Sequence, residues 1–328
     1  MVDVARRAGV SHQTVSRVIN DPDSVRTETR EKVLTAIREL DYRPNRAARA
    51  LVTGRTGTIG VVAYDTRLFG PASTLHAIQL AAQSASHSVN IVSLDSLERE
   101  QVFDAVGRLR DQGVDGIIII APEVAAASAL MEIPADLPVV AVEGLLDAPI
   151  PVVAVDQFLG ATKATRHLLD LGHSNVWHIA GPGDWYEARA REQGWRASLE
   201  EVGIEPPDPL AGDWSPRSGY EQGRELIRSG ADFTAVFVGN DQMALGVMRA
   251  VREAGLVVPD DVSVVGFDDI PEAAYFAPPL TTVRQEFLEV GTLSMAMLLQ
   301  RLRGGGEGPM KQVVEPDLVA RASTAPPR

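Results

Sequence analysis

The chain has 328 residues, of which 45% are hydrophobic and 23% charged, and it contains no cysteine. Because this length is large for one hydrophobic core, we expect two or three domains. The lack of cysteine excludes disulfides, thiolate metal sites and cysteine nucleophiles. No apolar run reaches the roughly 18 residues that a membrane-spanning helix needs, and the first residues lack an apolar signal-peptide core, so we expect a cytoplasmic protein.

The charge is distributed unevenly along the chain. Residues 1–55 carry 11 Lys and Arg against 7 Asp and Glu, whereas the whole chain has a net charge of −13. A small basic head on a large acidic body is typical of a polyanion-binding module joined to a second function. Arginines that merely solvate a helix face give the same asymmetry, so the charge alone does not separate the two interpretations.

The N-terminal residues predict a series of short helices. Residues 3–8 (DVARRA) read as a first helix, which Gly9 and Val10 interrupt. Ser11 is expected to cap a second helix over 12–20, because its hydroxyl can accept the N–H of Thr14. In that helix three apolar residues face inward: Val15, Val18 and Ile19.

The rest of this region completes the pattern. A loop (NDPDS, 20–24) follows, and Thr27 is expected to cap a third helix that extends to about Leu40. On the second helix Gln13 and Arg17 share the outer face, because they are four residues apart. A helix, a tight glycine turn, a capped helix, a loop and a helix together predict a helix-turn-helix unit.

A linker follows the predicted unit. The residue before Pro44 resists helix, so DYRP ends the unit. Residues 45–52 (NRAARALV) can form two helical turns capped by Asn45, but so short a helix is unstable alone because nucleation is costly. Thr53, Gly54 and Arg55 complete the linker.

From Thr58 onward, short apolar runs alternate with helical stretches. The first set of strands is TIGVVA, VNIVSL, DGIIII and PVVAV, with amphipathic segments near 74–87 and 97–112; the second is PVVAV (151–155), VWHIAG, the residues before GDW, AVFVG and VSVVGF. Fully apolar strands alternating with helices indicate parallel sheets that are covered on both faces. Two sets in series predict two doubly wound α/β lobes, with a cleft at the carboxyl ends of the strands.

Enzyme motifs are missing from the sequence. It contains no G-x-S-x-G, H-E-x-x-H, P-loop or G-x-G-x-x-G, since GPGDWY lacks the third glycine. The six histidines show no metal-ligand spacing. Asp268 and Asp269, which follow a predicted strand, suit either catalysis or the binding of hydroxyl groups. We therefore expect neither an enzyme, nor a metal site, nor a cofactor.

Several motifs occur together in a characteristic order. They are VARRAGVSHQTVSRVIN, TREKV, DYRPNRAARAL, TGTIGVV, NDQMALGVMRA and SVVGFDD followed by PPLTTVRQ. From residue 3 to about 324 the chain resembles the LacI/GalR family of bacterial transcription repressors. The resemblance implies a helix-turn-helix DNA-binding domain (1–44), a hinge helix and linker (45–56), and a periplasmic-binding-protein-like domain for effector binding and dimerisation (57–328). Its lobes would be discontinuous, about 57–156 with 285–313, and 157–284 with 314–328.

The resemblance makes the second helix a recognition helix in the major groove. There His12, Gln13 and Arg17 would reach base edges, since Gln pairs with adenine and Arg with guanine. Three hydroxyl residues suit phosphate contacts: Ser11, Thr14 and Ser16. The hinge helix of the family orders on DNA, which places Asn45, Ala48 and Leu51 on the operator, with Leu51 in the central base step of the minor groove. The alternatives are a solvated helix face and an ordinary linker.

For the effector, the resemblance carries over a set of residues in the cleft: Arg191, Trp214, Asn240, Asp268 and Gln285. Charged and amide groups would bind vicinal hydroxyls, and an aromatic face would cover the apolar side of a sugar ring. A sugar, specifically a galactoside, would close the lobes and weaken operator binding. Peripheral positions differ from a well-known family pattern and bear on the substituent: Tyr64, Asp65, Glu143 and Glu187. An effector of the purine or phosphosugar class is the alternative within the family.

Two further expectations concern the ends of the chain and its assembly. Family members carry several residues before DVA, so we expect either that the first helix is undercapped or that the start of the chain is assigned too late. The chain stops at RASTAPPR, without the apolar heptads of a tetramerisation helix, which predicts a homodimer on a near-palindromic operator. A solute receptor for a transporter shares the cleft fold, but it would need an export signal and no basic head.

Overall fold

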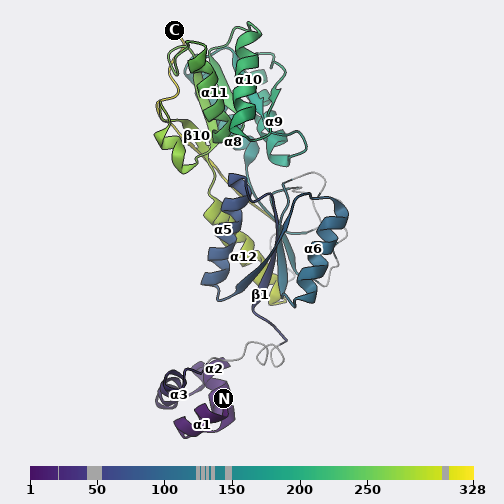
Figure 1. Cartoon of the computed structure of the whole chain (residues 1–328), viewed down its shortest axis with the longest axis vertical. Coiled ribbons are helices and arrows are strands. Elements are labelled where there is room, and N and C mark those ends of the chain that lie inside the picture. The colour runs from purple at the N-terminus through teal and green to yellow at the C-terminus, as the bar shows by residue number, and fades with distance from the viewer. Residues whose placement is uncertain are drawn as a thin grey trace. The chain divides into compact units, whose positions relative to one another are not determined.

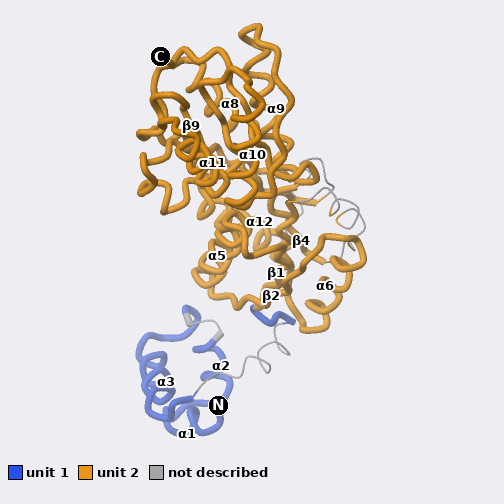
Figure 2. Tube along the Cα trace, turned by 45° about the horizontal axis from the view of Figure 1, so that its top comes forward, with its two compact units in different colours: residues 1–57 blue, residues 58–328 orange. Residues whose placement is uncertain are grey.

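The computed structural model describes residues 1–20, 22–42, 54–122, 126, 130, 133, 137–144, 150–304 and 310–328, with the backbone only at Asn20 and Pro22. The chain divides into two compact units, Met1–Gly57 and Thr58–Arg328, shown in two colours in Figure 2. Each unit has a hydrophobic core of its own. In the described parts of both units, no helix is both long and apolar enough to span a membrane.

The first unit is built from short helices around a small core. Its elements are α1 (Val2–Ala8), α2 (His12–Asn20), the 3-10 turn η1 (Pro22–Ser24) and α3 (Thr27–Glu39) (Figure 1). The core contains Val4, Ala5, Val15, Val18, Val33 and Ala36. Ser11 caps α2 as predicted, because its Oγ accepts a hydrogen bond from the Thr14 N–H at 3.1 Å. The helix-turn-helix arrangement is therefore confirmed.

The start of α3 differs from the prediction, which was wrong about its cap. Thr27 is the first helical residue, and Arg26 is the N-cap, with no hydrogen bond from its side chain. The Arg26 carbonyl accepts the first bond of the helix, from the Arg30 N–H at 3.0 Å. Helix α1 also has no side-chain cap, as expected of its start at Met1. The predicted hinge contacts of Asn45, Ala48 and Leu51 lie outside the described residues.

The second unit begins with a parallel sheet. Among the described residues its strand order is β11-β5-β4-β3-β1-β2. The strands are β1 (Thr58–Tyr64), β2 (Ser88–Leu94), β3 (Gly116–Ile120), β4 (Val139–Val142), β5 (Val152–Val155) and β11 (Lys311–Val314). Along β1, Ile59 and Val61 pack beneath α5 (Phe69–Ser84) and α12 (Phe287–Leu302), while Val62 lies on the face covered by α6 (Arg99–Asp111) (Figure 1).

A second sheet has the order β12-β10-β9-β8-β6-β7, in which only the β10–β12 pairing is antiparallel. The strands are β6 (Val176–Ala180), β7 (Leu210–Ala211), β8 (Ala235–Val238), β9 (Ser263–Asp268), β10 (Thr281–Arg284) and β12 (Asp317–Val319). Helices α8 (Gln157–Asp170) and α9 (Tyr186–Glu201) cover one face, and α10 (Pro216–Arg228) and α11 (Asp241–Glu253) the other; a 3-10 turn, η2 (Pro271–Tyr275), follows β9. The expected pair of doubly wound lobes is confirmed.

Some elements escaped the sequence patterns. Strands β10, β11 and β12 are short, and β11 and β12 lie at sheet edges where buried and exposed residues mix, so they lack a continuous apolar run. Helix α5 spans Phe69–Ser84 instead of 74–87. Pro71 lies in the first turn of this helix, where proline is tolerated because its missing N–H has no partner to lose.

Where the chain passes between the sheets decides which residues can reach the cleft. In the described residues it crosses after β5, after β10 and after β11. The first crossing leads directly into α8, whose N-cap Asp156 accepts a hydrogen bond from the Leu159 N–H at 2.8 Å. Gln157 therefore lies at the first crossing, after the carboxyl end of β5, and Gln285 lies at the second, after the carboxyl end of β10.

Helices α10 and α11 approach each other closely because glycine faces glycine. A Cβ atom on Gly246 would lie 2.0 Å from the Pro216 carbonyl oxygen, and one on Gly219 would lie 2.1 Å from the Met243 carbonyl oxygen. Both neighbours are backbone atoms, which cannot turn aside as a flexible side chain can. The packing of this face of the second sheet therefore requires these glycines.

We predict that Gly246→Ala lowers the free energy of unfolding by about 1–3 kcal/mol, the usual cost of overpacking. Gly107→Ala in α6 is the matched control, because a Cβ atom at that position would meet nothing within 4 Å. There the better helix propensity of alanine should raise stability by up to about 1 kcal/mol. Urea unfolding of both variants checks this, and a neutral Gly246→Ala would contradict the packing account.

Candidate functional site

The exposed surface of α2 carries the residues that the sequence assigned to DNA. Ser11, His12, Gln13 and Arg17 are exposed, and Thr14 and Ser16 are partly buried. The Ser11 and Thr14 hydroxyls lie 2.9 Å apart at the N-terminal end of the helix. This end also presents free backbone N–H groups, which favour anions.

The cationic side chains of the first unit differ in their pairing. Arg6, Arg7 and Lys32 form ion pairs with Asp3, Glu39 and Glu28, at 3.4, 2.7 and 2.8 Å. Arg17 forms none within the described part of the chain. The guanidinium on the outer face of α2 is therefore available to a partner outside the unit.

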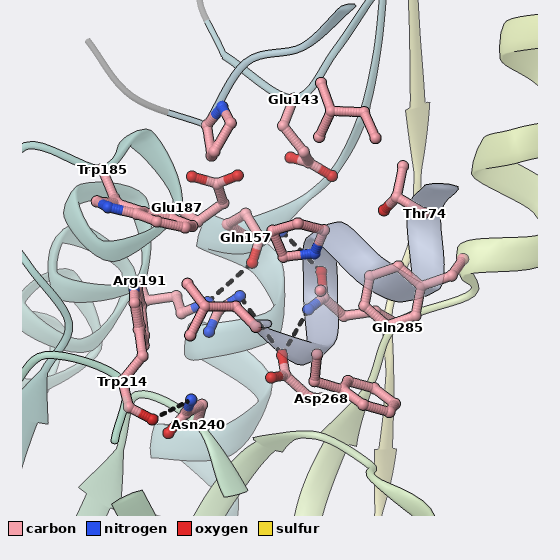
Figure 3. A pocket seen from close by; sticks show the side chains of 17 residues that line it. Thr74, Glu143, Gln157, Trp185, Glu187, Arg191, Trp214, Asn240, Asp268 and Gln285 are labelled. Carbon is pink, nitrogen blue, oxygen red and sulfur yellow. Dashed lines mark hydrogen bonds and ion pairs between the residues drawn. The ribbon is translucent and has the colours of Figure 1, made fainter. Parts of the chain in front are cut away.

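A pocket within the second unit lies at the carboxyl ends of both sets of strands (Figure 3). It encloses about 530 Å³ of empty space, mouth included. Its walls come from the start of α5, the ends of β3 and β4, the crossing residues, α9, and the loops after β6, β7, β8 and β9. Among the predicted effector residues, seven line it: Glu143, Glu187, Arg191, Trp214, Asn240, Asp268 and Gln285.

Four buried polar side chains form a closed ring at one wall of the pocket (Figure 3). Arg191 Nε donates to Gln157 Oε1 at 2.9 Å, and Gln157 Nε2 donates to Gln285 Oε1 at 2.8 Å. Gln285 Nε2 donates to Asp268 Oδ1 at 2.7 Å, and the same oxygen lies 3.7 Å from Arg191 Nη2. We call Gln157, Arg191, Asp268 and Gln285 the polar ring. Each glutamine both donates and accepts a hydrogen bond, so the ring connects the crossing after β5 to the crossing after β10.

Aromatic side chains form the apolar wall. The rings of Trp185 and Trp214 meet edge to face with centroids 5.6 Å apart, and the Arg191 guanidinium lies 5.4 Å from the Trp214 ring. Gly181 makes room for this tryptophan, because a Cβ atom there would lie 2.0 Å from Trp214 Cη2. The buried Trp214 Nε1 has no hydrogen-bond partner among the described residues.

The backbone is strained at three residues of the pocket. Glu143, Trp214 and Asp268 have φ angles of 60°, 71° and 108°, values that favour glycine. Such conformations cost free energy, and they persist where the surrounding structure enforces them, commonly at functional sites. At Asp268 the neighbouring Asp241 helps to enforce it, since its Oδ2 accepts the Ile270 N–H at 2.8 Å.

Burial changes the protonation of the acidic residues. It raises the pKa of Asp268 to about 6, although the Arg191 charge and the Gln285 amide oppose the rise. It raises the pKa of Glu143 to about 7, against hydrogen bonds from the Val155 N–H and the Gln157 side chain. Near neutral pH, Asp268 beside Arg191 is therefore more fully ionised than Glu143.

Asn240 has a structural task beside its place on the wall. Its Oδ1 accepts the Met243 N–H at 2.8 Å and so caps α11, and its Nδ2 donates to the Trp214 carbonyl at 3.1 Å. The side chain thereby fixes the Trp214 loop against the start of α11. A ligand that approaches Asn240 meets an amide whose orientation is already determined.

Two predicted effector residues lie elsewhere. The Tyr64 ring packs against Trp185 with centroids 5.7 Å apart, behind the pocket wall. Asp65 forms an exposed ion pair with Arg67 at 2.7 Å. The structure does not bring these two to the pocket, so their part in effector binding stays a prediction.

Sequence reasoning overlooked several lining residues, chiefly Gln157, Trp185, Thr74, Phe69 and Phe287. Gln157 and Trp185 each follow a predicted strand by a few residues, and that position could have revealed them. Phe69 precedes the amphipathic segment expected near 74–87, and Thr74 is the first residue of that segment. Within the described ranges, no group of three or more potential metal ligands comes together.

Comparisons with known proteins agree with this architecture. A family model for bacterial regulatory proteins of the lacI family matches residues 1–45, and a model for a periplasmic binding protein-like domain matches residues 165–324. The lactose operon repressor of Escherichia coli (strain K12) is 38% identical over 332 residues, which cover 100% of this chain and 91% of the relative. The repressor PurR of Haemophilus influenzae is 34% identical, with 98% and 97% covered.

A solved structure is similar over almost the whole chain. The crystal structure of the lac repressor dimer bound to operator and the anti-inducer ONPF has a TM-score of 0.86 and 37% identity, and the match covers 98% of both chains. A helix-turn-helix unit followed by a two-lobed binding domain is common to the structure and to these relatives. The chain therefore belongs to the lacI family of bacterial regulatory proteins.

Proposed function

We propose that the chain is a transcription repressor that binds a near-palindromic operator as a homodimer and is released by a small sugar, a galactoside. The observation that carries the effector assignment is the polar ring facing two tryptophans in one enclosed pocket. The lactose operon repressor and the lac repressor dimer on its operator, to which the chain is similar, support the same assignment.

The chemistry of the pocket suits a sugar. Sugar hydroxyls donate and accept hydrogen bonds, and the pocket offers both a buried guanidinium and buried carboxyl groups, on Arg191 and Asp268. The apolar face of a sugar ring packs well on an aromatic surface, which Trp185 and Trp214 provide.

A purine is the second candidate, because PurR is 34% identical and the tryptophans offer a surface for stacking. A phosphosugar suits the pocket less. A phosphate would meet the carboxyl groups of Glu143, Glu187 and Asp268, and the only lining cation among the described residues, Arg191, is already paired. Like charges that lie close to one another in a buried site cost free energy.

A thermal-shift panel separates these effectors, since a ligand that binds only the folded state raises the melting temperature. We expect a galactoside to raise it, by an amount equivalent to about 2.7 kcal/mol at one hundred times its Kd. The panel contains methyl galactoside, hypoxanthine, guanine and galactose 6-phosphate. A shift of the melting temperature with the purines alone would show that the effector is a purine and not a sugar.

The DNA assignment predicts that Gln13→Ala and Arg17→Ala each cost about 1–3 kcal/mol of specific operator binding and relax specificity. The log of the affinity should fall linearly with the log of salt concentration. Arg38→Ala removes one charge from α3 of the same unit and is the control, expected to affect operator and random DNA alike. Fluorescence anisotropy measures both. Equal losses on both DNAs for Gln13→Ala and Arg17→Ala would show that the two residues contact only phosphates.

The effector assignment predicts a non-inducible variant. Arg191→Ala opens the polar ring and removes its guanidinium donor, so operator binding should persist while release by a galactoside is lost. Arg189→Ala, on the exposed side of the same helix, is the matched control and should be released normally. Gel shifts with and without the sugar decide, and operator binding itself shows that the variant is folded. Release of Arg191→Ala at the wild-type sugar concentration would contradict the site.

A further inference from the structure

One end of the pocket holds an acidic residue that the protein itself leaves unsatisfied. Glu187, in the first turn of α9, is 7% exposed and lines the pocket. Its buried Oε2 has no hydrogen-bond partner among the described residues. A buried polar atom without a partner is costly, and in native proteins it points to a ligand or to another group that satisfies it.

A second acid faces the same end. Glu143 follows β4 with a φ of 60° and lines the pocket, and its Oε1 accepts the Val155 N–H at 3.2 Å. Figure 3 shows the carboxyl groups of Glu143 and Glu187 at one end of the pocket, with Asn240 at the other. The two acids interact, since Glu143 further raises the pKa of Glu187, which burial already raises well above its usual range.

No cation of the described pocket wall forms an ion pair with either acid, and the charge of Arg191 lowers their pKa values by less than burial raises them. Arg191, the cation that lines the pocket, donates to Gln157 Oε1 and to the Gly239 carbonyl, and it lies 3.7 Å from Asp268. Two buried carboxyl groups that share a site ionise reluctantly: burial raises the pKa of both, and Glu143 raises that of Glu187 further. A ligand with a single positive charge at this position stabilises the ionised form of the pair.

Resting on the proposed sugar-binding function, we propose that the effector is an amino sugar whose protonated amine binds between Glu143 and Glu187. An ammonium group has three N–H donors, enough for Glu187 Oε2 and for Glu143, whereas a hydroxyl has one donor and no charge. The polar ring and the tryptophans would hold the rest of the sugar.

A divalent cation suits the pair less than an amine. Calcium takes six to eight oxygen ligands and magnesium six, but the structure brings no third potential metal ligand to this pair within its described residues. A free alkyl amine would satisfy the carboxyl groups but would leave the aromatic wall and the polar ring without contacts. The combined site therefore selects an amine carried on a sugar.

Isothermal titration calorimetry at pH 7.5 tests the proposal with matched ligands. The probes are galactosamine and 6-amino-6-deoxygalactose, with galactose, N-acetylgalactosamine and methylamine as controls. At least one amino sugar should bind about tenfold or more tightly than galactose, because a charge-assisted hydrogen bond is about twice as strong as a neutral one. Its preference should weaken as the pH falls from 7 to 5, because burial raises the pKa of Glu143 to about 7 and that of Glu187 well above its usual range, so the acids lose negative charge.

Two variants link the preference to the acids. Glu187→Gln keeps the shape and removes one of the two acids, so the ratio of amino-sugar to galactose affinity should fall towards one; Glu143→Gln should lower it in the same direction. Glu200→Gln, on the exposed face of α9, is the control and should keep the ratio of the wild type. An unchanged ratio in Glu187→Gln would overturn the proposal.

The other outcomes are also distinct. Galactose binding as tightly as both amino sugars would refute the amine site and leave the sugar-binding function standing. Methylamine binding as tightly as the amino sugars would show a site for free amines and overturn the amino-sugar assignment. Binding of none of the sugars would refute the proposed function itself, and the amine site with it.

Discussion

The second unit depends on the polar ring of Gln157, Arg191, Asp268 and Gln285. Two of its members lie at chain crossings, and the other two come from α9 and the end of β9, so one hydrogen-bonded circuit joins the parts that surround the pocket. Buried polar groups are stable only when all their partners are present. The ring therefore fixes the pocket wall as a unit, and a change at one member is felt by the other three.

This dependence suits a regulator. A ligand shifts a conformational equilibrium only by its difference in affinity for the two states. On the proposed function, a sugar hydroxyl that replaces one bond of the ring would change the geometry at both crossings, because Gln157 and Gln285 bond directly to each other. The strained backbone of Glu143, Trp214 and Asp268 adds a cost that a ligand would offset on binding. Effector binding in the pocket would thereby be coupled to the geometry of the lobes.

The sequence predicted the fold well where one physical signal was strong. Continuous apolar runs revealed the central strands of both lobes, and Ser11 marked the start of α2. Edge strands such as β11 gave no such signal, and Thr27 was taken for a cap although the Arg26 backbone does that work. In the pocket, Asp268 and Asn240 could be assigned because they follow strands, with the resemblance to the family as support.

The rest of the pocket depends on contacts that no local pattern encodes. Gln157 becomes important only because Gln285, 128 residues away, meets it. Asp65 follows β1 just as Asp268 ends β9, yet a neighbouring arginine pairs with it outside the pocket. Position at a strand end is therefore a useful but insufficient guide, and side-chain pairing also decides which residues line the pocket.

The central claim is that the pocket and the operator-binding unit are coupled, and linkage makes that coupling reciprocal. The most direct test measures the Kd of a galactoside for the protein by calorimetry, alone and saturated with operator DNA. The account predicts that operator weakens sugar binding by the factor by which sugar weakens operator binding, about 5–150-fold. The same Kd with and without operator would contradict it.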